Sequence, residues 1–120
     1  MFHENSPIFQ QVAQIISDDI LNGTYEEGAS VASTNDFASF YRINPATAGK
    51  GINLLVDQGI LYKQRGIGMF VAHGAREKLR QHRLEEFRKT RLREFLHEAH
   101  ALGLSIADVQ NLIDQEFPHD

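Results

Sequence analysis

Three polar residues near the middle of the chain lie at the N-terminal end of an expected helix. Asn44 stands at its start, and Thr47 and Lys50 follow at intervals of three. At a helix N-terminus, their amide, hydroxyl and ammonium groups could read base edges in the major groove of DNA, with the methyl groups of Ala46 and Thr47 contacting thymine. The alternative is structural: Asn44 caps the helix and Thr47 faces solvent.

A second candidate follows about fifteen residues later. Arg65 is followed by Gly66, Ile67 and Gly68, and glycines at a hairpin tip let the backbone approach a phosphate or a minor groove closely. The alternative is a solvated arginine beside two turn glycines. Taken alone, the Gly66-x-Gly68 spacing carries no phosphate-loop signal.

The elements around these residues predict a helix-turn-helix. Ser33 with Asp36 three residues later favours the start of a short helix. Asn44-Pro45 favours a second start, since Asn caps helices and Pro suits the first helical position. The second helix would run to Asp57, and only about three residues separate the two helices, which is typical of the motif.

Flanking elements complete a winged domain. An apolar face spaced for a helix follows Ser6-Pro7, with Ser6 as the expected cap and Gly23 as the end of the helix. Ser30 to Ala32 favours a very short strand. Residues 60–64 and 69–72 are strand-like and predict the two strands of a hairpin wing.

The charge distribution is uneven. The formal net charge is −4, and residues 1–72 hold four basic against seven acidic residues, although phosphate binding requires Lys and Arg. All four basic residues of this part lie between Arg42 and Arg65. We therefore expect a polarised domain with a thin basic face.

The C-terminal part predicts a helical dimerisation tail. No helix breaker occurs from Ala75 to Leu102, Gly103 follows, and Ser105 with Asp108 favours a final helix. A tail this small has no core of its own and must bury its apolar stripe, most simply against a second copy; the alternative is that it folds back on the wing domain. The residues expected at the dimer interface are Leu92, Phe95, Leu96, Ala99, Leu102, Val109, Leu112 and Ile113.

The stretch from Arg76 to Arg93 holds eight basic and three acidic residues. It predicts a solvated helix face with ion pairs four residues apart, such as Glu85–Lys89. Contacts to the DNA backbone or to another anionic surface are the alternatives.

Several classes of function are excluded or disfavoured. The chain has no cysteine, and 42% of its residues are hydrophobic, so we expect a globular protein without disulfides or thiolate metal sites. No signal peptide or membrane span is expected, which favours the cytoplasm. His97 and His100 could share a metal on a helix, but a polar helix face is favoured, and we expect neither a metal nor a cofactor. No catalytic motif indicates an enzyme.

The sequence resembles the GntR family of bacterial transcription regulators. The matching segments are Pro7 to Val12 with Ile20 to Gly23, Ile43 to Thr47, and Gly59 to Leu61 followed by Gln64 to Val71. The Asn-Pro-x-Thr start of the second helix, the short tail and the segment from Glu98 to Ser105 are similar to the YtrA-type subfamily. The resemblance implies a homodimer that binds an inverted-repeat operator in double-stranded DNA, usually as a repressor, under the control of a small molecule or stress signal.

Some positions depart from the family pattern. Members usually carry Leu-Pro-Ser-x-Arg-x-Leu-Ala, in which the Arg contacts DNA, whereas Asn35 stands at that position here and Asp36 follows it. Met69 stands where the family has Thr, and Gly49 and Gly51 are unusual in the second helix. A winged helix that has lost tight DNA binding and acts through protein contacts is therefore the alternative function.

These patterns together predict a mainly α (α+β) fold with two domains. Residues 1–73 would form a winged helix-turn-helix and residues 74–120 a helical dimerisation tail. The residues expected at the DNA are Ser33, Thr34, Asn35, Arg42, Asn44, Ala46, Thr47, Lys50, Arg65, Gly66, Ile67 and Gly68.

Overall fold

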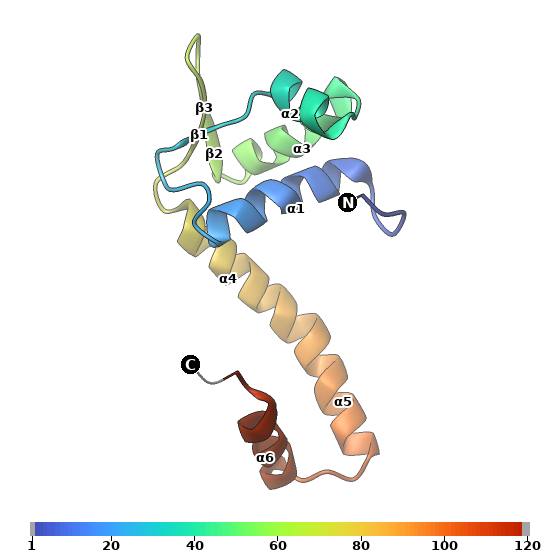
Figure 1. Cartoon of the computed structure of the whole chain (residues 1–120). Coiled ribbons are helices and arrows are strands. Elements are labelled where there is room, and N and C mark those ends of the chain that lie inside the picture. The colour runs from blue at the N-terminus through green and yellow to red at the C-terminus, as the bar shows by residue number, and fades with distance from the viewer. Residues whose placement is uncertain (1, 119–120) are drawn as a thin grey trace. The chain divides into compact units, whose positions relative to one another are not determined.

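The computed structural model describes residues 2–118 and separates the chain into two compact units, Met1–Gln81 and His82–Asp120. Figure 1 shows the elements in chain order. The first unit contains α1 (Ile8–Leu21), β1 (Ser30–Val31), α2 (Thr34–Tyr41), α3 (Pro45–Asp57), β2 (Leu61–Gln64), β3 (Gly68–Val71) and the start of α4 (Ala75–Phe87).

Helix α1 forms one wall of the core of this unit. Val12, Ile16 and Ile20 recur on one helical face and are almost completely buried, which stabilises the fold by about 1.5–3 kcal/mol per side chain. The expected Ser6 cap is wrong, because Pro7 is the N-cap and no side chain bonds there. Instead, the buried Gln11 side chain donates to the carbonyls of His3 and Ser6, at 2.7 and 2.8 Å, and fixes the preceding segment.

The helix-turn-helix packs on α1 through its second helix. Helix α3 contacts both α1 and α2, and α2, α3 and the hairpin lie to the same side of α1 (Figure 1). Pro45–Asp57 has the expected bounds, and Gly59 follows at a φ of +76°. The largest fully buried side chains of the core are Val12, Ile20, Ile52, Leu55, Ile60, Leu61 and Val71.

The wing belongs to a three-stranded antiparallel sheet of order β1-β3-β2. Leu61 pairs with Val71 and Gln64 with Gly68, so the hairpin loop contains three residues. Strand β1 is only Ser30–Val31, and it pairs with Phe70 and Met69 of β3. The expected winged helix-turn-helix is therefore confirmed.

The first unit extends past the boundary expected at His73. Ala75 and Leu79, in the first turns of α4, are buried in the core of this unit. The Glu27 carboxylate accepts hydrogen bonds from the backbone N–H groups of Gly74 and Arg76, at 2.9 and 3.3 Å. The compact unit thus ends eight residues beyond the expected boundary, and a separate domain over residues 74–120 stays a prediction.

The second unit is helical throughout. It contains the end of α4, a π-helical turn η1 (Arg88–Leu92), α5 (Arg93–Ala101) and α6 (Ile106–Glu116). The expected uninterrupted helix is therefore modified at η1, where the Thr90 hydroxyl donates to the Glu86 carbonyl at 2.7 Å. Gly103 ends α5 at a φ of +74°. Ser105 and Asp108 form the complete capping box that begins α6.

Candidate nucleic-acid interface

The N-terminus of α3 holds the first group of candidate residues. The Asn44 side-chain oxygen accepts hydrogen bonds from the backbone N–H groups of Ala46 and Thr47, at 2.7 and 3.4 Å. Asn44 and Ala46 are exposed and Thr47 is half-buried. Because capping uses only the amide oxygen, the NH₂ group of Asn44 remains available as a donor. Asn44 is therefore a structural cap that can also contact a base.

Lys50 lies one turn further along α3, but its charge is engaged within the unit. The Lys50 ammonium lies 4.1 Å from the centroid of the Phe9 ring in α1. These two residues line an open cavity of about 550 Å³ with Asp57 and other residues of α3. An exposed cation–π contact of this kind contributes about 0.5–1 kcal/mol. A DNA phosphate can therefore displace the ammonium from the ring with little loss of free energy.

The N-terminus of α2 provides the second group. The Ser33 hydroxyl accepts a hydrogen bond from the backbone N–H of Asp36 at 3.1 Å, so Ser33 caps the helix. Thr34 is half-buried and Asn35 is exposed. The Asp36 side chain places a carboxylate at this end of the helix, which disfavours a nearby phosphate.

Arg42 links the two helices in an unusual conformation. Its φ of 56° and ψ of 49° place it in the left-handed region as the C-cap of α2. The Ile43 backbone N–H then donates to the Ala38 carbonyl at 3.0 Å. The left-handed backbone conformation is about 1–2 kcal/mol less favourable for a non-glycine residue. The residues packed around this tight turn must therefore stabilise it. Arg42 itself is exposed.

The wing tip provides the third group, and all four of its predicted residues are exposed. The Ile67 backbone N–H donates to the Gln64 carbonyl at 2.9 Å across the turn. Gly66 has a φ of +76° at the third position of this turn, where a type II turn requires a left-handed residue. Ile67 is 69% exposed beside Arg65, and the tip therefore presents a cation together with an apolar side chain.

The two unusual glycines of α3 have different surroundings. A Cβ atom on Gly51 would lie 2.5 Å from the Phe9 carbonyl oxygen and 2.8 Å from the Val12 side chain. Glycine is thus required for the close approach of α3 to α1. On Gly49 a Cβ atom would meet only the Thr34 methyl group, at 3.4 Å. Both glycines are unusual in the sequence, but only the packing shows that Gly51 is required and Gly49 is not.

The predicted dimerisation residues fall into two sets in the second unit. Ala99 and Val109 are already buried within the single chain. Leu92 is half-buried, and the other five retain a large apolar surface: Phe95 (45% exposed), Leu96 (49%), Leu102 (67%), Leu112 (44%) and Ile113 (46%). Ile106 and Phe117, which the sequence pattern did not select, are exposed to 78% and 66%.

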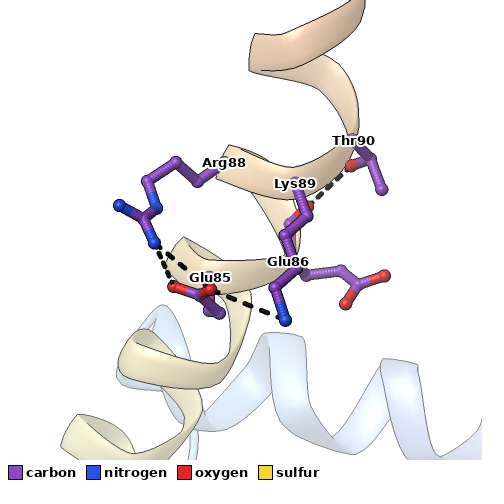
Figure 2. A network of polar contacts seen from close by, with 5 residues as sticks. All are labelled: Glu85, Glu86, Arg88, Lys89 and Thr90. Carbon is purple, nitrogen blue, oxygen red and sulfur yellow. Dashed lines mark hydrogen bonds and ion pairs between the residues drawn. The ribbon is translucent and has the colours of Figure 1, made fainter.

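The basic stretch contains the ion pairs that its spacing predicts. Figure 2 shows Glu85 beside Arg88 and Lys89, with N···O distances of 3.1 and 3.6 Å. The two cations lower the pKa of the Glu85 carboxyl from its ordinary value, mainly through the hydrogen bond from Arg88. Exposed pairs of this kind contribute little to stability, and the predicted i,i+4 pair Glu85–Lys89 is confirmed.

Residues 2–118 contain neither a cluster of metal ligands nor a helix that could span a membrane. No group of three His, Cys, Asp or Glu side chains there is placed to bind a metal ion. None of the helices in this part of the chain has the length and apolar character required to cross a bilayer.

Known proteins resemble this chain over most of its length. The crystal structure of a GntR-family regulator from Bacteroides thetaiotaomicron is 35% identical, with a TM-score of 0.77, over 92% of this chain and 95% of that chain. The chain belongs to the GntR family. No protein-family model matches it.

The curated relatives of this GntR-family member agree with the assignment. The transcriptional repressor YtrA of Bacillus subtilis is 24% identical over 111 residues, which are 92% of this chain and 85% of YtrA. The expected YtrA-type resemblance is thereby confirmed. The regulator YurK of Bacillus subtilis is 37% identical over 67 residues, and the chain spans only 28% of its length.

A DNA complex is among the similar structures. AraR(DBD), solved in complex with the operator ORR3, is 32% identical with a TM-score of 0.55, over 60% of this chain and 88% of that chain. These relatives are transcription regulators by name, and this GntR-family chain is accordingly a transcription regulator rather than an enzyme.

Proposed function

We propose that this GntR-family chain acts as a homodimeric repressor that binds an inverted-repeat operator. The main support is the exposed N-terminus of α3 together with the wing tip. Asn44, Ala46 and Arg65 are exposed, on a fold shared with AraR(DBD), which was crystallised with its operator. In such motifs the second helix enters the major groove and its first residues meet the base edges.

In this proposal the contacts have distinct roles. The Asn44 NH₂ group and the Thr47 side chain contact bases, while Arg42 and Lys50 neutralise phosphates. Arg65 at the wing tip reaches the adjacent backbone or minor groove, with Gly66, Ile67 and Gly68 allowing close approach. Ser33, Thr34 and Asn35 make polar contacts to the phosphate backbone from the start of α2.

Repression is proposed from the relatives, and dimerisation from the second unit. YtrA is a transcriptional repressor by name. Five predicted interface residues in unit two, Phe95, Leu96, Leu102, Leu112 and Ile113, are 44–67% exposed, and burying them against a second copy would contribute about 25 cal/mol per Å² of apolar surface. Two-fold symmetry would then match a palindromic site. Control by a small-molecule effector is part of the proposal.

The first test is fluorescence anisotropy with the DNA upstream of this protein's own gene and a scrambled duplex. We expect tight binding to the upstream DNA alone, weakening steeply with salt because counterions are released. Thr47→Ala should weaken specific binding by roughly 5- to 150-fold, which corresponds to about 1–3 kcal/mol at a base contact.

Arg65→Ala is paired with Lys63→Ala, which removes a cation from the same hairpin outside the predicted contacts. We expect Arg65→Ala alone to reduce the slope of log K against log salt by about 1. Equal, weak binding to both duplexes would contradict the proposal and favour the alternative, a winged helix acting through protein contacts. The exposed Asp36 carboxylate beside Asn35 is the feature that would explain that outcome.

A further inference from the structure

A cavity on the first unit is formed by residues outside the predicted DNA contacts. It measures about 370 Å³, which lies within the range of small-molecule sites. Its walls come from the second half of α1, the following loop, Ala32 and one side of α2. The lining residues are Ile16, Asp19, Tyr25, Ala32, Asp36, Phe37, Phe40 and Tyr41.

Aromatic rings supply half of these lining residues. The Tyr41 ring centroid lies 4.6 Å from that of Phe37 and 4.9 Å from that of Phe40. Phe37 is buried and fixes this cluster to the core, whereas Phe40 is 79% exposed. Faces of aromatic rings attract cations through their quadrupole, and cages of such rings recognise quaternary ammonium groups.

Two carboxylates and no basic side chain accompany these rings. Within residues 2–118, neither Asp19 nor Asp36 forms an ion pair with a Lys or Arg side chain. Asp36 occupies the position of α2 that Asp108 occupies in α6. The Asp108 carboxylate accepts from the Ser105 backbone N–H and completes a capping box, but the Asp36 carboxylate makes no such bond at Ser33.

The Tyr41 hydroxyl is affected by both burial and the Asp19 charge. Burial raises the pKa of Tyr41 above its ordinary value of 10.0, and the Asp19 charge raises it further. Burial disfavours any charge, but the Asp19 carboxylate, which disfavours a phenolate, favours a cation.

We propose that this cavity binds a small organic cation, an ammonium or quaternary ammonium carrying an apolar group. Its charge lies against the Asp19 and Asp36 carboxylates, and its apolar part packs on the rings of Phe37 and Tyr41. Asp36 directly follows Asn35 and lies two positions after Thr34. A bound cation would therefore reduce the negative charge beside these two predicted DNA contacts. That consequence for DNA rests on the proposed function, whereas the binding itself does not.

The test is performed on the full chain without DNA, so its outcome is independent of operator binding. Choline and its uncharged isostere 3,3-dimethylbutanol are titrated, and backbone and ring NMR shifts are followed. We expect choline to shift Tyr25, Phe37 and Tyr41 and to bind roughly tenfold more tightly than the alcohol, a difference of about 1.4 kcal/mol.

Substitutions at the cavity test the role of the Asp19 charge separately from any effect on folding. Asp19→Asn and Phe40→Ala should each weaken choline binding several-fold, and Asp19→Glu should retain it. Asp57→Asn, which removes a carboxylate outside the cavity, is the matched control, and thermal unfolding checks that each variant folds. Equal binding of choline and the alcohol, shifts outside the cavity, or unchanged affinity in Asp19→Asn would overturn the proposal.

Discussion

Single residues of α3 show how the packing between helices limits which side chain is allowed. Gly51 faces the Phe9 carbonyl and Val12 of α1, and its missing Cβ is what allows the two helices to approach. Gly49 has no such constraint, since a Cβ atom there would lie 3.4 Å from a methyl group. Each glycine lowers helix propensity by about 1 kcal/mol relative to alanine, but only one is compensated by close packing.

We therefore expect Gly51→Ala, but not Gly49→Ala, to destabilise the fold. Gly51→Ala should lower the free energy of unfolding by about 1–3 kcal/mol because the added methyl group overpacks the α1–α3 contact. Gly49→Ala should leave it unchanged or raise it by up to about 1 kcal/mol. Urea unfolding at one fixed protein concentration measures both, and equal effects of the two substitutions would contradict this account.

The junction between the wing and α4 depends on one exposed carboxylate. Glu27 accepts hydrogen bonds from the backbone N–H groups of Gly74, just before α4, and of Arg76 in its first turn. The Glu27 Oε1 also lies 3.5 Å from the His73 Nδ1. The two backbone hydrogen bonds lower the pKa of the Glu27 carboxyl below its ordinary value of 4.5. Glu27 thus connects the start of α4 to the loop before β1.

This pKa shift fixes the pH dependence of the junction. Because the folded-state pKa is below that of the unfolded chain, the carboxylate stabilises the fold above pH 4.5, and this stabilisation is lost as the pH falls through the folded-state pKa. Glu27→Gln should therefore lower the melting temperature at neutral pH, and the difference from the wild type should shrink in acid.

Glu26→Gln is the control for this prediction, since it removes the charge of the neighbouring residue. Amide hydrogen exchange at Gly74 and Arg76 should accelerate in Glu27→Gln only. A pH-independent difference in melting temperature, or the same effect in both variants, would show that the Glu27 charge does not hold this junction.

The exposed apolar residues of the second unit are the main reason to expect a dimer. Leu112 and Ile113 of α6 are 44% and 46% exposed, whereas Ala99 and Val109 are buried without a partner. Homodimer interfaces are more apolar than the rest of a protein surface. A second copy would bury these side chains and position two winged domains for a palindromic operator.

Sedimentation should accordingly show a dimer for the wild-type chain at micromolar concentration. Leu112→Glu should shift it toward the monomer, because a charge in an apolar interface is left without a partner. Gln110→Glu adds the same charge to an exposed position of the same helix and should remain dimeric. A monomeric wild type would remove the dimer and favour a tail that folds back on its own wing domain.

Local signals in the sequence predicted the order and type of the elements, apart from the π-helical turn η1. The Asn44 cap and Gly59 correctly predicted the bounds of the helix Pro45–Asp57. The spacing of Ser105 and Asp108 correctly predicted the capping box of α6. The Ser6 cap was wrong, since Pro7 is the N-cap of α1 and no side chain caps it. Local motifs indicated Asn44 and Arg65 as candidate DNA residues, and the family resemblance indicated Asn35; their contacts to DNA stay a prediction.

Features that depend on atoms far apart in the chain emerged from the three-dimensional structure. It showed that Gly51 is required by α1, that the Lys50 ammonium lies over the Phe9 ring, and that α4 begins inside the first compact unit. It also brought Asp19 and Asp36 to one aromatic cavity. Periodicity identifies which face of a helix is apolar, but the neighbour of that face is set by packing between distant segments, which no local pattern encodes.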